Sequence, residues 1–113
     1  MAPVDVTVSR ILGTMRVGTT SNVTVIKIHV YSGTPTNDAD GLDTLTLTQR
    51  GEASFAEDDA SGFTNYNVYH LNAAQSGGGT ISAGDVVLIG FEPEGQAVGS
   101  SSFINFTIEF TEV

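Results

Sequence analysis

Cysteine and tryptophan are both missing from this chain of 113 residues, and basic side chains are scarce. Without cysteine there can be no disulfide and no cysteine-bound zinc. Four Lys and Arg residues stand against 13 Asp and Glu residues, which gives a formal net charge of −9. An acidic surface repels phosphate backbones and anionic lipid headgroups, so we expect neither a nucleic acid nor a membrane as partner.

Long apolar runs are absent as well. No stretch approaches the roughly 18 residues that a membrane-spanning helix needs. The first residues, MAPVDVTVSR, lack the basic region and apolar run of a secretory signal, so we expect no such signal there. A 3.6-residue apolar stripe, the mark of an amphipathic helix, occurs nowhere in the chain. The sequence therefore gives no indication of a helix of either kind.

Hydrophobic residues nevertheless make up 40% of the chain, and Thr, Ser and Gly accompany them. This mixture favours strands joined by turns, and the length fits one domain over residues 1–113. Apolar alternation and turn residues predict strands at 4–8, 22–31, 43–49, 66–71, 80–81, 85–91 and 102–110, with a further short strand at 15–17. We therefore expect an all-β, antiparallel β-sandwich of about seven or eight short strands.

Within the predicted strands, alternation also indicates which side chains face the core. The apolar residues expected inside on the second and third predicted strands are Ile26, Ile28, Val30, Leu45 and Leu47. Residues 50–63 lose this periodicity and predict a long loop excursion. The glycine-rich segment 73–79 predicts a flexible linker.

Two segments carry a resemblance to a known family. Gly18–Gly33 (GTTSNVTVIKIHVYSG) is a Gly-Thr loop followed by a strand that ends at a glycine turn. Thr80–Phe110 has the order I-x-x-G-D-V, then a glycine-containing loop and a terminal apolar strand. Together they resemble the small jelly-roll domains of tailed-phage virion proteins. Within the second segment, Gly84 permits a turn with positive φ, and Asp85 can accept hydrogen bonds that close it.

The resemblance implies a non-enzymatic structural protein of the virion, a capsid decoration (cement) or head-fibre protein. It further implies a homo-oligomer, a trimer, that binds the major capsid protein or another virion protein. The alternative is a carbohydrate- or receptor-binding module such as a tail-fibre tip. The stacking platform of such a module would draw on Tyr31, Tyr66, Tyr69, Phe55 and Phe63, although tryptophan is missing from the set.

Candidate interface residues follow from the same hypothesis. They are Phe55, Phe63, Tyr66, Val4 and Val6. Phe55 and Phe63 flank an acidic stretch, where they either form an exposed contact for another subunit or fold back onto their own sheet. The N-terminal MAPVDV segment is a candidate arm for strand addition on a neighbouring subunit.

Candidate metal and catalytic sites are few. Asp38, Asp40 and Asp43 cluster around Gly41, and loop carboxylates are the ligands that calcium prefers. Their spacing departs from that of an EF-hand, so we interpret the cluster as an acidic turn and keep a calcium-stabilised adhesion domain as an alternative. Two histidines without a G-x-S-x-G turn indicate no catalytic triad. We therefore expect no enzymatic activity, no metal and no cofactor.

Overall fold

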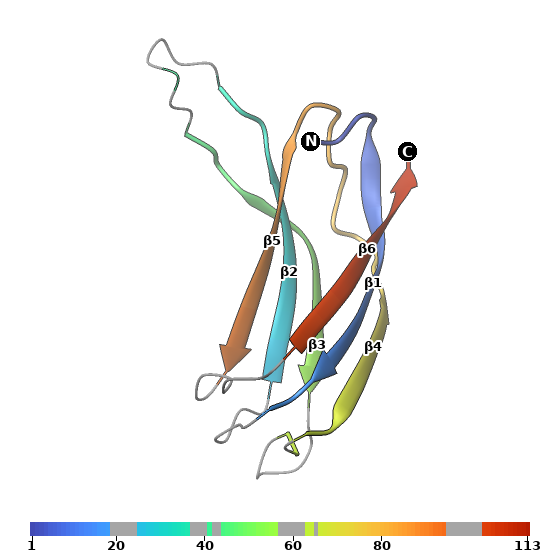
Figure 1. The fold of residues 1–113 in the computed structure, drawn as a ribbon. Coiled ribbons are helices and arrows are strands. Elements are labelled where there is room, and N and C mark those ends of the chain that lie inside the picture. The colour runs from blue at the N-terminus through green and yellow to red at the C-terminus, as the bar shows by residue number, and fades with distance from the viewer. Residues whose placement is uncertain (19–24, 37–40, 42–43, 57–62, 65, 95–102) are drawn as a thin grey trace.

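Six β-strands form the described part of the chain in a computed structural model (Figure 1). The residues described are 1–18, 25–36, 41, 44–56, 63–64, 66–94 and 103–113. The strands are β1 (Val6–Arg16), β2 (Val25–Gly33), β3 (Thr48–Ala56), β4 (Val68–Ala74), β5 (Val86–Glu94) and β6 (Phe103–Glu112). Nothing in these ranges is helical, which agrees with the all-β prediction. No helix in this part of the chain has the length and apolar character needed to cross a membrane.

The six strands form two antiparallel sheets of three strands each. One sheet has the order β4-β1-β6 and the other the order β3-β2-β5, and Figure 1 shows them as two adjacent layers. The backbone N–H of Val113 donates to the carbonyl of Asp5 over 3.0 Å. The first and last strands are therefore neighbours, and both ends of the chain lie at the same end of the molecule (Figure 1).

The central strands, β1 and β2, together supply half of the buried hydrophobic residues of the described core. Their inward side chains are fully buried: Ile11, Met15, Ile26, Ile28 and Val30. These residues belong to one hydrophobic cluster that joins both sheets. The prediction that alternate residues of the second strand face inside is thus confirmed, because a strand flanked on both edges buries its whole apolar face.

On one side of the molecule the two sheets come close together, because β3 of one sheet approaches β1 and β4 of the other. Glycine makes this approach possible. A Cβ on Gly13 would lie 2.9 Å from the ring of Phe55, and a Cβ on Gly51 would lie 3.2 Å from the side chain of Val8. The sheets therefore meet most closely where side chains are smallest.

The turn before β5 has the structure expected of its sequence. Gly84 has a φ of +88°, a conformation that side chains disfavour. The carboxylate of buried Asp85 accepts a hydrogen bond from the backbone N–H of Ser82 at 3.1 Å and from the hydroxyl of Thr34 at 2.7 Å. The predicted role of Gly84 and Asp85 in closing this turn is confirmed.

Several predicted boundaries are wrong. The described residues hold six strands rather than seven or eight. The short strand predicted at 15–17 is the end of β1, and Ile81 forms an isolated bridge with Val6 instead of a strand. The jelly-roll arrangement of the sheets stays a prediction.

The third strand differs most from the prediction. It begins at Thr48, so the strand predicted at 43–49 is correct only at Thr48 and Gln49 among its described residues, and Leu47 is exposed rather than inward. The rest of β3 occupies residues 50–56, which the sequence predicted as part of a long loop. Its inward positions include Gly51 and Ala53, which carry too little apolar surface to produce visible alternation, although Phe55 is buried beside them.

Candidate interaction surfaces

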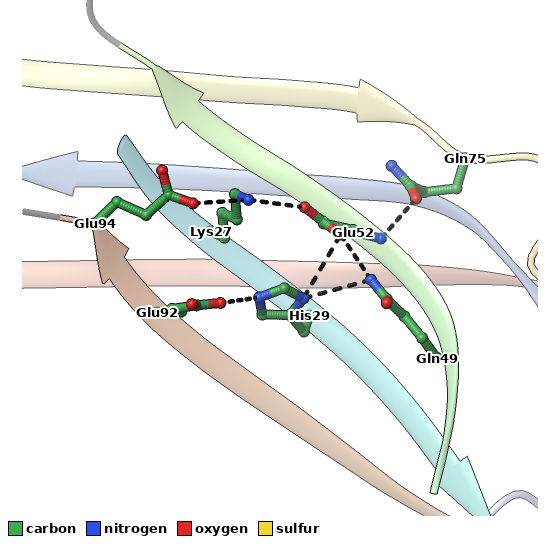
Figure 2. A network of polar contacts seen from close by, with 7 residues as sticks. All are labelled: Lys27, His29, Gln49, Glu52, Gln75, Glu92 and Glu94. Atoms are coloured by element: carbon green, nitrogen blue, oxygen red, sulfur yellow. Dashed lines mark hydrogen bonds and ion pairs between the residues drawn. The ribbon is translucent and has the colours of Figure 1, made fainter. Parts of the chain in front are cut away.

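A cluster of polar side chains covers the outer face of the β3-β2-β5 sheet (Figure 2). We call it the outer polar cluster, and it consists of Lys27, His29, Gln49, Glu52, Gln75, Glu92 and Glu94. Lys27 and His29 lie on the central strand, so carboxylates from both neighbouring strands can reach them. Alternation along β2 places these two residues opposite to the buried Ile26, Ile28 and Val30.

Ion pairs hold this cluster together. The Nζ atom of Lys27 lies 2.8 Å from Oε1 of Glu94 and 3.6 Å from Oε1 of Glu52. The Nε2 atom of buried His29 lies 2.9 Å from Oε2 of Glu92. Glu52 also accepts a hydrogen bond from Nε2 of Gln49 at 2.8 Å. The sheet is therefore fastened across its outer face by contacts that span all three strands.

Two groups of the cluster have shifted pKa values. The hydrogen bond to Glu94 and the charge of that carboxylate raise the pKa of Lys27 above its ordinary value. The hydrogen bond from Gln49, together with the charge of Lys27, lowers the pKa of Glu52. Both shifts lead away from neutral pH, whereas a general acid or base works best with a pKa near it. The pair is thus suited to cohesion of the sheet.

The edge of β3 is covered by the segment after β4. The side chain of Gln75 accepts a hydrogen bond from the backbone N–H of Glu52 at 3.0 Å, and Nη1 of Arg50 donates to the carbonyl of Gly78 at 3.3 Å. A Cβ on Gly78 would lie 1.9 Å from the carbonyl oxygen of Arg50. The prediction of a flexible linker at 73–79 is therefore wrong, because Ala73 belongs to β4 and both Gly78 and Gly79 lie close to Arg50 of β3.

On the opposite side of the molecule the sheets do not close. The edge strands there are β5 and β6, and no Cα atom of one lies within 8 Å of a Cα atom of the other. Ile89 and Phe91 pair with the buried Val30 and Ile28, so they face the space between the sheets. They are nevertheless 43% and 45% exposed.

The facing strand behaves in the same way. Phe106 and Phe110 pair with Gly13 and Val8, both buried on β1, and so also face the space between the sheets. Their side chains are 37% and 42% exposed. Ile104 and Ile108, on the same face of β6, pack against the core. The inward face of this strand is therefore partly covered at Ile104 and Ile108, whereas the two phenylalanines on that face are exposed.

An apolar cleft of about 440 Å³ opens on this side. The side chains that line it are all apolar and uncharged: Met1, Ala2, Pro3, Val6, Val87, Ile89 and Phe110. We call the cleft, together with the inward faces of Ile89, Phe91, Phe106 and Phe110, the open side. It is an apolar surface without charge on an acidic protein, and such surfaces mark contacts with other molecules.

The predicted interface residues are dispersed. Phe55 and Phe63 are buried in the core, which corresponds to the fold-back alternative rather than to an exposed subunit contact. Tyr66 is exposed and lies beside Arg16, whose guanidinium is 5.5 Å from the ring centre. Val4 is exposed, whereas Val6 is half-buried and lines the apolar cleft.

The N-terminal segment lies against its own chain. Ala2 donates to the carbonyl of Asp85 at 3.1 Å and accepts from the N–H of Gly84 at 2.8 Å. The predicted docking arm is thus occupied within the single chain, where it forms one wall of the apolar cleft.

The aromatic platform of the alternative hypothesis is not assembled in the described part of the chain. Phe55 and Phe63 are buried, and Tyr69 packs edge-on against Phe63 with its hydroxyl bound to the N–H of Thr64. Tyr31 stacks on His29 at the outer polar cluster, with ring centres 5.7 Å apart.

The proposed calcium ligands Asp38, Asp40 and Asp43 lie outside the described residues. Among the residues that are described, no three His, Asp or Glu side chains are placed to hold a metal ion. The carboxylates that His29 contacts, those of Glu52 and Glu92, belong to the outer polar cluster. His70 is exposed on β4.

Comparison of the chain with protein-family models, with curated proteins and with solved structures gave no match. The functional argument therefore rests on this chain alone. Sequence reasoning missed the open side, although one signal was present: residues 86–91 are apolar on both faces of their strand, more than a sheet with one wet face requires.

Proposed function

We propose that this chain is a non-enzymatic structural protein of a virion, a capsid decoration (cement) or head-fibre protein that works as a homo-oligomer. The observation that carries the proposal is the open side. An apolar surface without charge on a protein of net charge −9 is a liability in an isolated chain and an advantage in an assembly. Its burial contributes about 25 cal/mol per Å², before the costs of association.

Strand pairing gives partial support to the jelly-roll part of this proposal. A jelly roll winds a long antiparallel hairpin into two sheets, so that strands equally far from its ends pair. Here β1 pairs with β6 in one sheet and β2 pairs with β5 in the other. The innermost pair departs from that pattern, because β3 stays beside β2 and β4 beside β1.

The first experiment is the mass of the purified protein in solution, measured by light scattering at physiological salt over a range of concentrations. We expect a stable multiple of 11.8 kDa, a trimer by the resemblance to virion proteins. A monomer at every concentration would contradict the homo-oligomer.

The particle itself is tested separately. Protein added to virions purified from its own source should co-sediment with them and stay in the supernatant without them. Failure to co-sediment, combined with a stable oligomer, would leave an oligomeric protein with a role elsewhere.

A further inference from the structure

We propose that copies of this chain meet through the open side, with the free edge of β6 against the neighbouring copy. The inference rests on the homo-oligomer of the proposed function and names its contact surface. Within the described ranges, each sheet ends there in a strand that pairs along one edge only, and four inward side chains of these two strands are exposed: Ile89, Phe91, Phe106 and Phe110. Another copy would cover at once the strand edge and the apolar residues beside it.

The unpaired edges indicate a polypeptide partner rather than a small apolar ligand. A strand edge presents a row of backbone N–H and C=O groups that another strand can pair with. Natural edges are usually protected by lysine, proline or charge. Between Phe103 and Phe110, β6 has neither lysine nor proline, and its single carboxylate, Glu109, lies 3.7 Å from Nε of Arg10.

The edge of β5 is less suitable. Pro93 has no N–H to donate, and the adjacent Glu92 and Glu94 are held on the outer face by His29 and Lys27. We therefore assign the strand contact to β6, while Ile89 and Phe91 of β5 contribute apolar surface.

Charge favours a second copy at this surface over one at the outer polar cluster. Two copies that each carry −9 repel one another, and the repulsion is greatest where carboxylates face each other. The outer polar cluster holds three glutamates, whereas no side chain that lines the apolar cleft is charged. The open side is thus a place where like-charged copies can meet without burying charge.

The available area is close to what a stable interface needs. The ten residues of β6 extend over about 34 Å, and the smallest dimension of the molecule is 19 Å. A face of these dimensions measures on the order of 650 Å², against about 800 Å² per partner in a typical stable interface.

The test uses charge substitutions on the full chain. Phe110→Glu and Ile89→Glu each place a carboxylate on the open side of every copy. The matched control is Val68→Glu, an exposed position on β4 at the opposite edge of the same sheet as β6. We expect the first two variants to be monomeric by light scattering with an unchanged circular dichroism spectrum, and the control to keep the oligomer.

The outcomes separate the two proposals. If the wild type is oligomeric and both open-side variants remain so, the inference is wrong while the homo-oligomer stands. If the wild type is a monomer at every concentration, both fail. Binding of a fluorescent apolar dye by that monomer would assign the open side to a different occupant.

Two further measurements guard against variants that do not fold. Phe110→Ala and Ile89→Ala retain an apolar strand, and we expect each to raise the dissociation constant about tenfold or more. Hydrogen exchange of the wild type should show greater protection of amides in 103–112 at concentrations where the oligomer forms. If protection from exchange rises only for the backbone amides of the outer polar cluster, the inference is overturned.

Discussion

At the scale of single residues, buried polar groups and tightly fitted glycines hold the described chain. The buried side chain of Asp85 receives two hydrogen bonds, and Gly78 lies against the backbone of β3. The outer polar cluster adds exposed ion pairs. These three kinds of contact differ in how much water they exclude, so their removal should lower the stability of the fold by different amounts.

Asp85→Ala should lower the free energy of unfolding by about 1–3 kcal/mol, because it removes the buried carboxylate that accepts hydrogen bonds from the N–H of Ser82 and the hydroxyl of Thr34. Thr34→Val removes only the second donor and should cost about 1 kcal/mol or less. Guanidinium unfolding followed by circular dichroism measures both. Equal stability of Asp85→Ala and wild type would show that the turn does not depend on this carboxylate.

Gly78→Ala should destabilise the protein by about 1–3 kcal/mol, because the new methyl group would overlap the Arg50 carbonyl and displace the segment that covers β3. Gly90→Ala is the matched control. Its Cβ would meet no atom nearer than 3.5 Å, and alanine in a strand costs less conformational entropy than glycine. We expect Gly90→Ala to be neutral or slightly stabilising, and a greater loss there than at Gly78 would contradict the described packing.

Glu52→Gln tests the pH dependence of the outer polar cluster. The folded-state pKa of Glu52 lies below its ordinary value of 4.5, so its stabilisation is present above that value and is lost as the pH falls through the folded-state pKa. The variant should melt about 1–3 °C below wild type at pH 7, and this difference should shrink as the pH falls below 4.5. The control variant Glu112→Gln removes an equal charge outside the cluster. Its melting temperature should not show this pH-dependent difference from wild type.

At the scale of elements, the position of a strand in its sheet decides what its residues contribute. The strand β1 lies between β4 and β6, and its Ile11 has no exposed surface. The strand β4 is an edge, and its first residue, Val68, is mostly exposed.

Ile11→Ala should therefore cost about 2–5 kcal/mol, the usual range for truncation of a large apolar side chain in a core. Val68→Ala should cost about 0.5 kcal/mol or less. Chemical unfolding of both variants measures the difference. Similar costs at the two positions would mean that β1 is not the centre of its sheet.

At the scale of the whole molecule, charge and apolar surface act in opposite directions. The net charge of −9 keeps copies apart, and the open side brings them together. Salt screens the repulsion over a Debye length of about 8 Å at physiological ionic strength and leaves the apolar contact intact.

Self-association should therefore strengthen as salt rises from about 20 mM to about 500 mM, because screening reduces the repulsion between copies. Sedimentation velocity at several salt concentrations measures the dissociation constant. Association that weakens with salt would indicate opposite charges across the interface, and so a contact away from the open side.

The sequence by itself determined those features that depend on near neighbours in the chain. Alternation identified β2 with its inward face and the apolar strand β6, and the Gly-Asp pair identified the turn at Gly84 and Asp85. Each of these depends on a period of two residues or on the conformational freedom of one glycine. The all-β class follows from the same local patterns.

Tertiary structure decided the rest, because it depends on which strands become neighbours. The strand β3 was hidden from the sequence, since its inward Gly51 and Ala53 are small to suit the close approach of β1. Phe55 and Phe63, predicted as interface residues, lie in the core for a related reason. The sequence pattern shows that a side chain is apolar, but it does not show which part of the chain covers it. Only the pairing order of the strands made β5 and β6 edge strands. The apolar face of an uncovered edge strand is part of the molecular surface, whereas the same face on a strand between two others is part of the core.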